Sequence, residues 1–390
     1  MCPGSLADVI ENREDGVSDK RREEWIDIMR CFDERKAMKQ IASGLRHLHG
    51  LGLVHRDIKP QNILISSSSS SRGRYRMLIS DLGLCKKLGD QSSFLSTAYG
   101  SIAAGTAGWR APEMLQCEDD ELESLDILGT SDDITMSSLG SSSSTSTTCQ
   151  CLSKSIDIFA LGCLYYYILT RGGHPYGLFD RQANIIEEIK DLSLISSNEE
   201  AHELIIHMLH RQPSQRPDIE TCLLHPFFWD SPKRLAFLGD ASDRFETLCK
   251  DPMDRVLIRL ERDAKIIVKT DWHQTLDGSV DQILIKNLRQ SRKYDGNSVR
   301  DLLRVLRNKV SLLFKYYYYL IEFSLLHQQR NHYQDLPDDV KYLLGSMPKG
   351  YLTYFTDRYP RLLVYVHEVV KDTGLYREPM FMTYFELPET

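Results

Sequence analysis

The stretch VHRDIKPQNILI, residues 54–65, decides how the first half of the chain is interpreted. Phosphoryl transfer needs a carboxylate that orients the attacking hydroxyl, a cation near the γ-phosphate, and oxygen ligands for Mg²⁺. Asp57 offers the carboxylate and Lys59 the cation. Asn62, together with the Asp81 of a later stretch, offers the ligands. A His-Arg-Asp triplet alone is usually a solvated turn, so the interpretation depends on what surrounds it.

Two further motifs follow in a fixed order. ISDLGLCKKL covers residues 79–88 and GTAGWRAPE covers residues 105–113. The short apolar text around RMLISDLG is bounded by turn residues and predicts a strand. Three such signatures in this order resemble the large lobe of the eukaryotic protein kinases, over residues 1 to about 230. In that lobe Asp57 and Lys59 would be catalytic, while Lys59, Asn62 and Asp81 would bind ATP and Mg²⁺.

The kinase resemblance assigns structural roles to other residues. Glu113 of Ala-Pro-Glu would pair with an arginine near the end of the lobe, and Arg216 fits that position. Asp157 of DIFALG would brace the catalytic loop, and Leu82 stands where the family usually has phenylalanine. The activation segment would contain candidate phosphorylation sites, although a flexible serine-containing loop is an equally good interpretation of each. These sites are Ser92, Ser93, Ser96 and Thr97.

The small lobe of a kinase has no counterpart in this text. Only 54 residues precede His55, and they contain neither a Gly-x-Gly-x-x-Gly loop nor a strand resembling Val-Ala-Ile-Lys. One half of an ATP site is therefore expected without the other. We expect this chain to bind ATP and Mg²⁺ weakly and to phosphorylate inefficiently.

Composition and patterning point to an ordinary globular protein of two or three domains. The 390 residues are 42% hydrophobic and 26% charged, with a net charge of −7. Nine cysteines without a Cys-x-x-Cys pair favour free thiols in a reducing compartment over disulfides or zinc. The N-terminal residues lack the basic and apolar regions of a signal peptide.

Periodicity predicts mainly helices. Residues 33–50 place Met38, Ile41, Leu45 and Leu48 on one helix face, with Gly50 as the stop. Residues 155–170 are apolar nearly all round and predict a buried helix. Further helices are expected at 253–262, 279–289, 298–309 and 361–371. The polar, serine-rich residues 117–154 predict a disordered insertion. These patterns divide the chain into domains at 1–232 and 233–390.

A strongly basic segment occupies residues 286–309. In SVRDLLRVLRNK, Val299, Leu302, Leu303 and Leu306 share one helix face, and Arg300, Arg304 and Arg307 share another. Such a basic face suits a phosphate backbone, whereas an exposed basic face without a ligand is the ordinary alternative.

The second half closely resembles the nuclease extension of the inositol-requiring enzyme family, the kinase-endoribonucleases of the unfolded-protein response. The resemblance rests on SDRFE, IVKTDWHQ, RKYDGNSVRDLLRVLRNK, HYQDLP and YFTDRYPRLL, and it covers residues 233–390. It implies an all-helical kinase-extension nuclease (KEN) domain behind a serine/threonine kinase lobe. The implied chemistry is metal-independent attack of a ribose 2′-hydroxyl on the neighbouring phosphate of a stem-loop RNA.

The nuclease resemblance also assigns catalytic roles. His332 would be the general acid, and Tyr294 the base or its positioner. Arg307, Asn308 and Lys309 would grip the scissile phosphate. Histidine suits the acid because its ordinary pKa is about 6.5, whereas a phenol of pKa about 10 is a poor base unless cations lower that pKa.

The family resemblance implies partners and a location. Its members self-associate through the kinase lobes and nuclease domains, on the cytosolic side of the endoplasmic reticulum, and no membrane segment is expected in this chain. Two alternatives stay open. One is a catalytically silent dimerising scaffold, and the other is a nuclease with a kinase-like lobe resembling ribonuclease L, whose ankyrin repeats have no counterpart here.

A run of 20 residues, Val310 to Gln329, interrupts the nuclease text. The apolar part, VSLLFKYYYYLIEFSLL, is too short and too charged, with Lys315 and Glu322, for a membrane span. In the family the asparagine and histidine lie four residues apart, and deleting 310–329 restores that step between Asn308 and His332. The run begins Val-Ser, which GT-containing codons can encode, and ends in Gln, encoded by CAG. We therefore hypothesise a retained, in-frame intron.

Overall fold

The computed structural model describes residues 4–11, 19–67, 75–88, 105–116, 153–269, 271–281, 294–309 and 337–387. The four candidate phosphorylation sites, residues 117–152, the run 310–329 and His332 lie outside the described residues. The chain forms two compact units, one of Met1–Ser196 with Ala201–Leu223 and one of Ser197–Glu200 with Leu224–Thr390. The two units are described separately.

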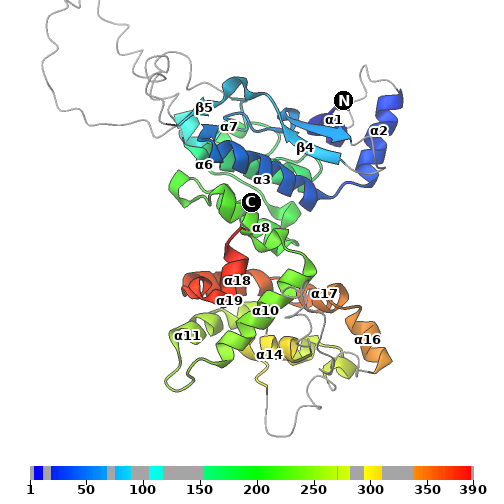
Figure 1. Ribbon diagram of the computed structural model, residues 1–390, viewed down its shortest axis with the longest axis vertical. Helices are drawn as coiled ribbons and strands as arrows, with labels where there is room; N and C mark the ends of the chain where they lie inside the picture. Colours follow the sequence, from blue (N-terminus) through cyan, green and yellow to red (C-terminus); the bar gives the residue numbers. More distant parts are fainter. Residues whose placement is uncertain are drawn as a thin grey trace, which may run out of the picture. The chain divides into compact units, whose positions relative to one another are not determined.

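The first unit combines two small antiparallel sheets with helices (Figure 1). One sheet has the strand order β1-β3-β4, and β2 pairs with β5 in the other. The strands are β1 Gly4–Ser5, β2 Leu53–Val54, β3 Ile63–Ser67, β4 Tyr75–Ile79 and β5 Lys86–Lys87. The helices are α1 Leu6–Glu11, α2 Asp19–Arg30, α3 Glu34–Gly50, α6 Lys154–Leu169, α7 Arg181–Ile186, α8 Glu199–Met208 and α9 Ile219–Leu224. Short 3-10 turns lie at Pro60–Asn62, Leu82–Leu84, Ser193–Ile195 and Pro213–Gln215.

Helix α3 confirms the expected helix with one difference. Asp33 caps it, because its carboxylate accepts a bond of 2.9 Å from the Lys36 N–H. The buried face contains Ala37, Met38, Ile41, Ala42, Leu45 and His49. Leu48, expected on that face, is only half-buried. His49 is buried in its place because its ring bonds a carboxylate inside the unit.

Helix α6 forms the centre of this unit. Thirteen consecutive residues, Ile156 to Ile168, are buried, as its uniformly apolar sequence predicts. Gly162 is required there, since a Cβ at this position would lie 2.9 Å from the Met208 side chain. The chain is mainly helical, as expected.

The second unit is built from helices around one core (Figure 1). Its helices are α10 Ser231–Glu246, α11 Arg255–Arg262, α12 Ala264–Ile267, α14 Val299–Lys309, α16 Asp338–Leu344, α17 Lys349–Arg358, α18 Leu362–Asp372 and α19 Pro379–Phe385. Short 3-10 turns lie at Pro226–Phe228, Trp272–Thr275 and Leu375–Arg377. The helices expected at 253–262, 298–309 and 361–371 are therefore confirmed. Most of the one expected at 279–289 lies outside the described residues.

Helix α14 buries the predicted apolar face. Val299, Leu302, Leu303 and Leu306 are completely buried among the residues of α10, α11 and α17. The Tyr351 hydroxyl of α17 donates a bond of 2.9 Å to the Leu306 carbonyl, near the C-terminal end of α14. The helix is thereby fixed at the end that carries the candidate nuclease residues.

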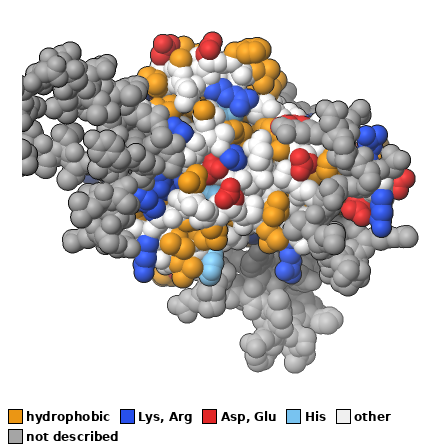
Figure 2. Space-filling view, turned by 90° about the horizontal axis from the view of Figure 1, so that it is seen from above, with side chains coloured by type: hydrophobic (Ala, Val, Ile, Leu, Met, Phe, Trp, Pro, Cys, Tyr) orange, Lys and Arg blue, Asp and Glu red, His pale blue; other side chains and the backbone are white. Residues whose placement is uncertain are grey.

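The visible surface mixes charges of both signs. On the face shown in Figure 2, basic, acidic and apolar side chains lie interspersed between the grey regions. No helix in the described part of the chain has the length and apolarity to cross a membrane.

His174 predicts how the first unit responds to acid. Its ring is buried, lies 5.0 Å from Trp109 by ring centroids, and accepts a bond of 3.2 Å from the Tyr176 N–H. Burial, with a smaller contribution from the positive charge of Arg181, lowers the pKa of His174 to about 3. The unfolded chain therefore binds a proton below pH 6.5 that the folded chain refuses, and stability falls as the pH drops from about 6.5 towards 3.

The variant His174→Asn keeps an acceptor for the Tyr176 N–H but cannot titrate. Between pH 7 and pH 5 the natural chain should lose about 2 kcal/mol more unfolding free energy than this variant. Urea unfolding at the two pH values measures the difference. Equal losses in both proteins would contradict the buried, neutral state of His174.

Candidate active sites and family

The Asp57 carboxylate is held by four donors in the first unit. Lys59 Nζ lies 2.6 Å from Oδ2, and Asn62 Nδ2 donates to the same oxygen at 2.8 Å. The backbone N–H and the hydroxyl of Thr106 donate to Oδ1 at 2.9 and 2.8 Å. Burial alone would raise the pKa of Asp57, but the bonds from Lys59, Thr106 and Asn62 outweigh it and hold that pKa below its usual range. The carboxylate is therefore ionised and fixed at neutral pH.

Asp157 of α6 holds the loop that carries Asp57 by hydrogen bonds. Asp157 accepts bonds of 2.8 Å from the backbone N–H groups of His55 and Arg56, and a bond of 2.9 Å from His49 Nε2. Arg56 has φ of +73°, a conformation that non-glycine residues adopt only under constraint. Because two of these bonds go to neighbouring N–H groups, Asp157 fixes the turn in which Arg56 sits.

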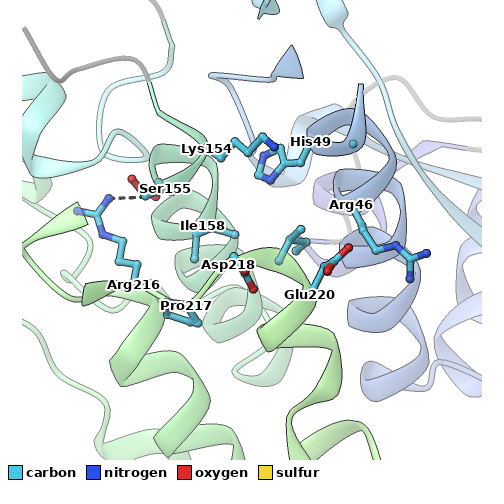
Figure 3. A pocket seen from close by; sticks show the side chains of 11 residues that line it. Arg46, His49, Lys154, Ser155, Ile158, Arg216, Pro217, Asp218 and Glu220 are labelled. Atoms are coloured by element: carbon cyan, nitrogen blue, oxygen red, sulfur yellow. Dashed lines mark hydrogen bonds between the residues drawn. The ribbon is translucent and has the colours of Figure 1, made fainter. Parts of the chain in front are cut away.

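Glu113 and Arg216 form a two-bond ion pair of 2.7 Å each. Arg216 also donates to the carbonyls of His210 at 2.7 Å, Arg211 at 3.0 Å and Ser155 at 3.0 Å. Figure 3 shows Arg216 turned towards Ser155, and both residues line a pocket of about 390 Å³ that His49 borders from α3. The same arginine therefore ties together Glu113, the start of α6 and the 210–216 loop.

The described residues fit Mg²⁺ on one side of the candidate ATP site. Asn62 uses Nδ2 for both of its bonds to Asp57, so Oδ1 is the atom it would offer a cation. Asp81 directly follows Ser80. The N–H and the hydroxyl of Ser80 donate to the Asn62 carbonyl at 2.9 and 3.0 Å. Amide and carboxylate oxygens are the ligands that Mg²⁺ prefers. Leu82, the replacement for phenylalanine, is 53% exposed.

In the second unit, helix α14 is capped by a side chain from another helix. Glu261 of α11 accepts bonds from the Ser298 hydroxyl at 2.7 Å, the Val299 N–H at 3.0 Å and the Arg300 N–H at 3.1 Å. The two N–H groups belong to the first turn of the helix, where backbone donors have no partner inside the helix. An acid at this end also suits the helix dipole.

A chain of hydrogen bonds connects three of the predicted nuclease residues. Arg307 donates to Asn308 Oδ1 from Nε at 3.3 Å and from Nη2 at 2.9 Å. Asn308 Nδ2 in turn donates to the Tyr294 hydroxyl at 3.0 Å. Asp243 of α10 holds the other side of Arg307 at 2.8 Å. Because Arg307 occupies the amide oxygen, the amide nitrogen must face Tyr294, and the phenol proton is left to donate elsewhere.

The arginines of α14 do not form the exposed basic face that their spacing suggested. Arg304 is only 8% exposed and lies 2.8 Å from Asp301 and 3.2 Å from Glu246. Arg300 lies 3.7 Å from the same Glu246 oxygen. The expectation was wrong because α10, about 60 residues earlier in the chain, brings acids against this face, which spacing within α14 cannot show.

Tyr294 retains its proton more firmly than an ordinary tyrosine. Burial raises the pKa of its hydroxyl, and this outweighs the lowering by the Asn308 bond and by the positive charges of Arg304 and Arg307. The cationic neighbours therefore do not turn the phenol into a base at neutral pH. Of the two roles considered for Tyr294, positioning by hydrogen-bond donation fits this environment.

Comparison with known proteins finds a different family in each half of the chain. The family described as "Protein kinase domain" matches residues 1–130, and the family described as "Ribonuclease 2-5A" matches residues 234–312 and 320–385. The "Sensor for unfolded proteins in the ER ire1" of Schizosaccharomyces pombe is 39% identical, over 99% of this chain and 32% of its own length. The "Serine/threonine-protein kinase/endoribonuclease IRE1" of Hypocrea jecorina is 38% identical, over 99% of this chain and 29% of its own.

A human relative completes the comparison. The "Serine/threonine-protein kinase/endoribonuclease IRE2" of Homo sapiens is 36% identical, over 99% of this chain and 34% of its own length. This chain belongs to the IRE1 kinase/endoribonuclease family. It spans about a third of the length of these IRE1 relatives.

The match to the ribonuclease family is interrupted where the sequence is anomalous. Residues 313–319 fall between its two matched parts, inside the run 310–329. The chain thus departs from the IRE1 pattern between Asn308, which the structure describes, and His332, which it does not. Of the side chain of Lys309, at the end of α14, nothing is described.

Sequence reasoning missed the acids that organise the candidate site at the end of α14. Asp243 and Glu246 lie within SDRFE, a motif used for the resemblance but given no role, and Glu261 lies in a helix predicted only by its periodicity. Their signal was available as charge: three arginines on a helix with a buried apolar face need nearby carboxylates if they are buried too. Which carboxylates these would be could be known only from the packing.

Proposed function

We propose that the second unit is an endoribonuclease that cleaves RNA by 2′-hydroxyl transesterification. The observation that supports this most is the hydrogen-bond chain from Arg307 through Asn308 to Tyr294 at the end of α14. The ribose 2′-oxygen attacks the adjacent phosphorus while the bond to the 5′-oxygen breaks, which gives a 2′,3′-cyclic phosphate and a 5′-hydroxyl. Tyr294 and Asn308 orient the phosphate and the 2′-hydroxyl, whose proton passes to solvent, and His332 protonates the leaving 5′-oxygen.

The proposed reaction needs no metal ion. The phosphorane carries extra negative charge, and side chains that donate hydrogen bonds or carry positive charge can stabilise it directly. Arg307, Asn308 and Lys309 are residues of this kind. This donor set differs from the cluster of carboxylates on which two-metal nucleases depend.

We propose that the first unit is a serine/threonine kinase lobe that uses ATP and Mg²⁺. The fixed, ionised Asp57 carboxylate beside Lys59 supports this, because it can accept the proton of an attacking hydroxyl. The residues of this chain that would contact nucleotide come from the Asp57–Asn62 loop and from Asp81. We therefore propose weak ATP binding by the 390-residue chain.

Partners and location follow as proposals from the same family. The S. pombe relative is named as a sensor for unfolded proteins in the endoplasmic reticulum. For this chain we propose a stem-loop RNA substrate, self-association through the kinase lobe and the nuclease unit, and a place at the cytosolic side of that membrane. A catalytically silent scaffold is the competing proposal, and it predicts self-association without cleavage.

We propose that residues 310–329 interrupt the nuclease site and derive from a retained intron. Removing them places His332 four residues after Asn308, one helical turn or its continuation, so that both side chains can reach one phosphate. A displacement of about 1 Å in a catalytic group can already cost about 100-fold in rate. Transcript reads that keep all 20 codons would remove the intron origin without affecting the proposal of an interrupted site.

The nuclease proposal predicts the order of activity in three matched chains. The chain lacking 310–329 should cleave a stem-loop RNA at least about 100-fold faster than the natural chain, since its acid returns to the phosphate. His332→Ala in the shortened chain should lower the rate by about 100-fold or more. Single-turnover cleavage at several protein concentrations measures both effects. If the shortened chain and its His332→Ala variant are equally inactive at every concentration, the scaffold proposal replaces the enzyme.

The kinase proposal predicts a weak nucleotide site. Titration calorimetry of the purified 390-residue chain with ATP and Mg²⁺ should give a Kd weaker than micromolar. Asp81→Asn should abolish the residual binding that depends on Mg²⁺, because it removes a ligand carboxylate. Micromolar affinity would overturn the proposal of a half-built site.

A further inference from the structure

Glu246 is a charged residue near the nuclease site to which the proposed reaction gives no role. It ends α10, and its carboxylate is 21% exposed. Its Oε1 lies 3.2 Å from Arg304 Nε and 3.7 Å from Arg300 Nε, two arginines one turn apart on α14. One carboxylate thus faces two guanidinium groups: that of Arg304, which lies against the Tyr294 ring, and that of Arg300, at the start of α14.

Arg304 links Glu246 to Tyr294. Its guanidinium lies 5.2 Å from the centre of the Tyr294 ring, within the range of a cation–π interaction. Asp301 holds the same guanidinium at 2.8 Å and also accepts a bond of 2.8 Å from the Asp295 N–H, next to Tyr294. Asp301 therefore holds Arg304 in place. Glu246 contributes a negative charge beside the guanidinium and is not needed to position it.

Besides Glu261 of α11, whose carboxylate accepts a bond of 3.1 Å from the Arg300 N–H, several charged side chains lie around Tyr294 and its arginine neighbours. From α14 they are the cations Arg300, Arg304 and Arg307 and the anion Asp301, with the uncharged Asn308 on the hydroxyl. From α10 they are Asp243, which neutralises Arg307, and Glu246. The side chain that meets Tyr294 from the 271–281 segment is the uncharged Trp272, at 6.1 Å between ring centroids. Without Glu246, the buried Arg304 and the half-buried Arg300 would share the single side-chain carboxylate of Asp301.

We propose that Glu246 is a positioning residue of the nuclease site: it balances the charges of the buried Arg304 and the half-buried Arg300, and so keeps the Tyr294 hydroxyl a hydrogen-bond donor to the RNA phosphate. A net positive charge beside the ring would stabilise the phenolate, which cannot donate. An acid on a neighbouring helix thus preserves the protonation state of a residue that it does not touch. The role in cleavage depends on the proposed nuclease function, whereas the charge balance does not.

The test measures Tyr294 directly. Tyrosine carrying ¹³C at Cζ is incorporated into the whole chain, and Tyr294→Phe identifies the Tyr294 signal among the 19 tyrosines. Glu246→Gln removes the charge and keeps the shape. Because Asp301 still holds Arg304 over the ring, the pKa of Tyr294 should fall by about one unit.

The matched control is Asp240→Asn, an acid on the same helix. Its carboxylate accepts the Tyr384 hydroxyl at 2.7 Å, so the variant disturbs α10 to a similar extent away from the α14 arginines. The Tyr294 pKa should not change. An unchanged or raised pKa in Glu246→Gln, or an equal fall in the control, would overturn the proposal.

Cleavage separates this proposal from the nuclease function on which it rests. In an active chain the rate should fall at alkaline pH, where Tyr294 loses its proton, and in Glu246→Gln that fall should begin about one pH unit lower. A fall in the Tyr294 pKa together with no cleavage by any variant would refute the nuclease function and leave the charge balance standing. If the Tyr294 pKa falls by the expected unit in Glu246→Gln but the cleavage rate declines at the same alkaline pH as before, the role of Glu246 in cleavage is refuted.

Discussion

The contact between the acids of α10 and the arginines of α14 is the constraint on which the second unit depends. Helix α14 buries Val299, Leu302, Leu303 and Leu306, and its packing also removes Arg304 from water. A buried guanidinium without a carboxylate is strongly destabilising, because its lost hydration is not replaced. Glu246 and Asp301 meet this need for Arg304, and Asp243 pairs with Arg307. Together these contacts fix the rotation and depth of the helix. The candidate site is a consequence of that fit: with Arg307 held by Asp243, Asn308 can turn only its nitrogen towards Tyr294.

Buried polar side chains also hold the first unit together. Asp157 is buried at the start of α6 and accepts bonds from a histidine ring and from two N–H groups of the loop that carries Asp57. Arg216, also buried, connects Glu113 to three backbone carbonyls. In both units, polar groups that cannot stay buried alone hold irregular segments in one conformation. Loops positioned in this way carry Asp57 in one unit, and the end of a helix carries Asn308 in the other.

Much of this arrangement could be predicted from the sequence because it depends on local pattern. The apolar periods of α3 and α14 predicted their buried faces, and the continuous apolar sequence of α6 predicted its complete burial. The order of the kinase motifs placed Asp57, Asn62 and Asp81 in one unit. What failed depended on distant partners. His49, and not Leu48, lies on the buried face of α3 because its ring bonds the Asp157 carboxylate. Asp157 lies 108 positions further along the chain, so the local pattern of α3 does not reveal it. Arg304 does not lie on an exposed basic face, because Glu246 and Asp301 contact its guanidinium. The pKa of Tyr294 could not be judged from its cationic neighbours, since burial raises it more than they lower it.

The chemistry of the α14 site is the central claim, and the ends of its RNA products test it most directly. A stem-loop RNA is incubated with the chain lacking 310–329, with EDTA in excess, and the new ends are analysed by mass spectrometry and by enzymatic end-labelling. The account predicts a 2′,3′-cyclic phosphate on one fragment and a 5′-hydroxyl on the other, at a rate that EDTA does not change. Products with a 3′-hydroxyl and a 5′-phosphate, or cleavage that stops in EDTA, would contradict it.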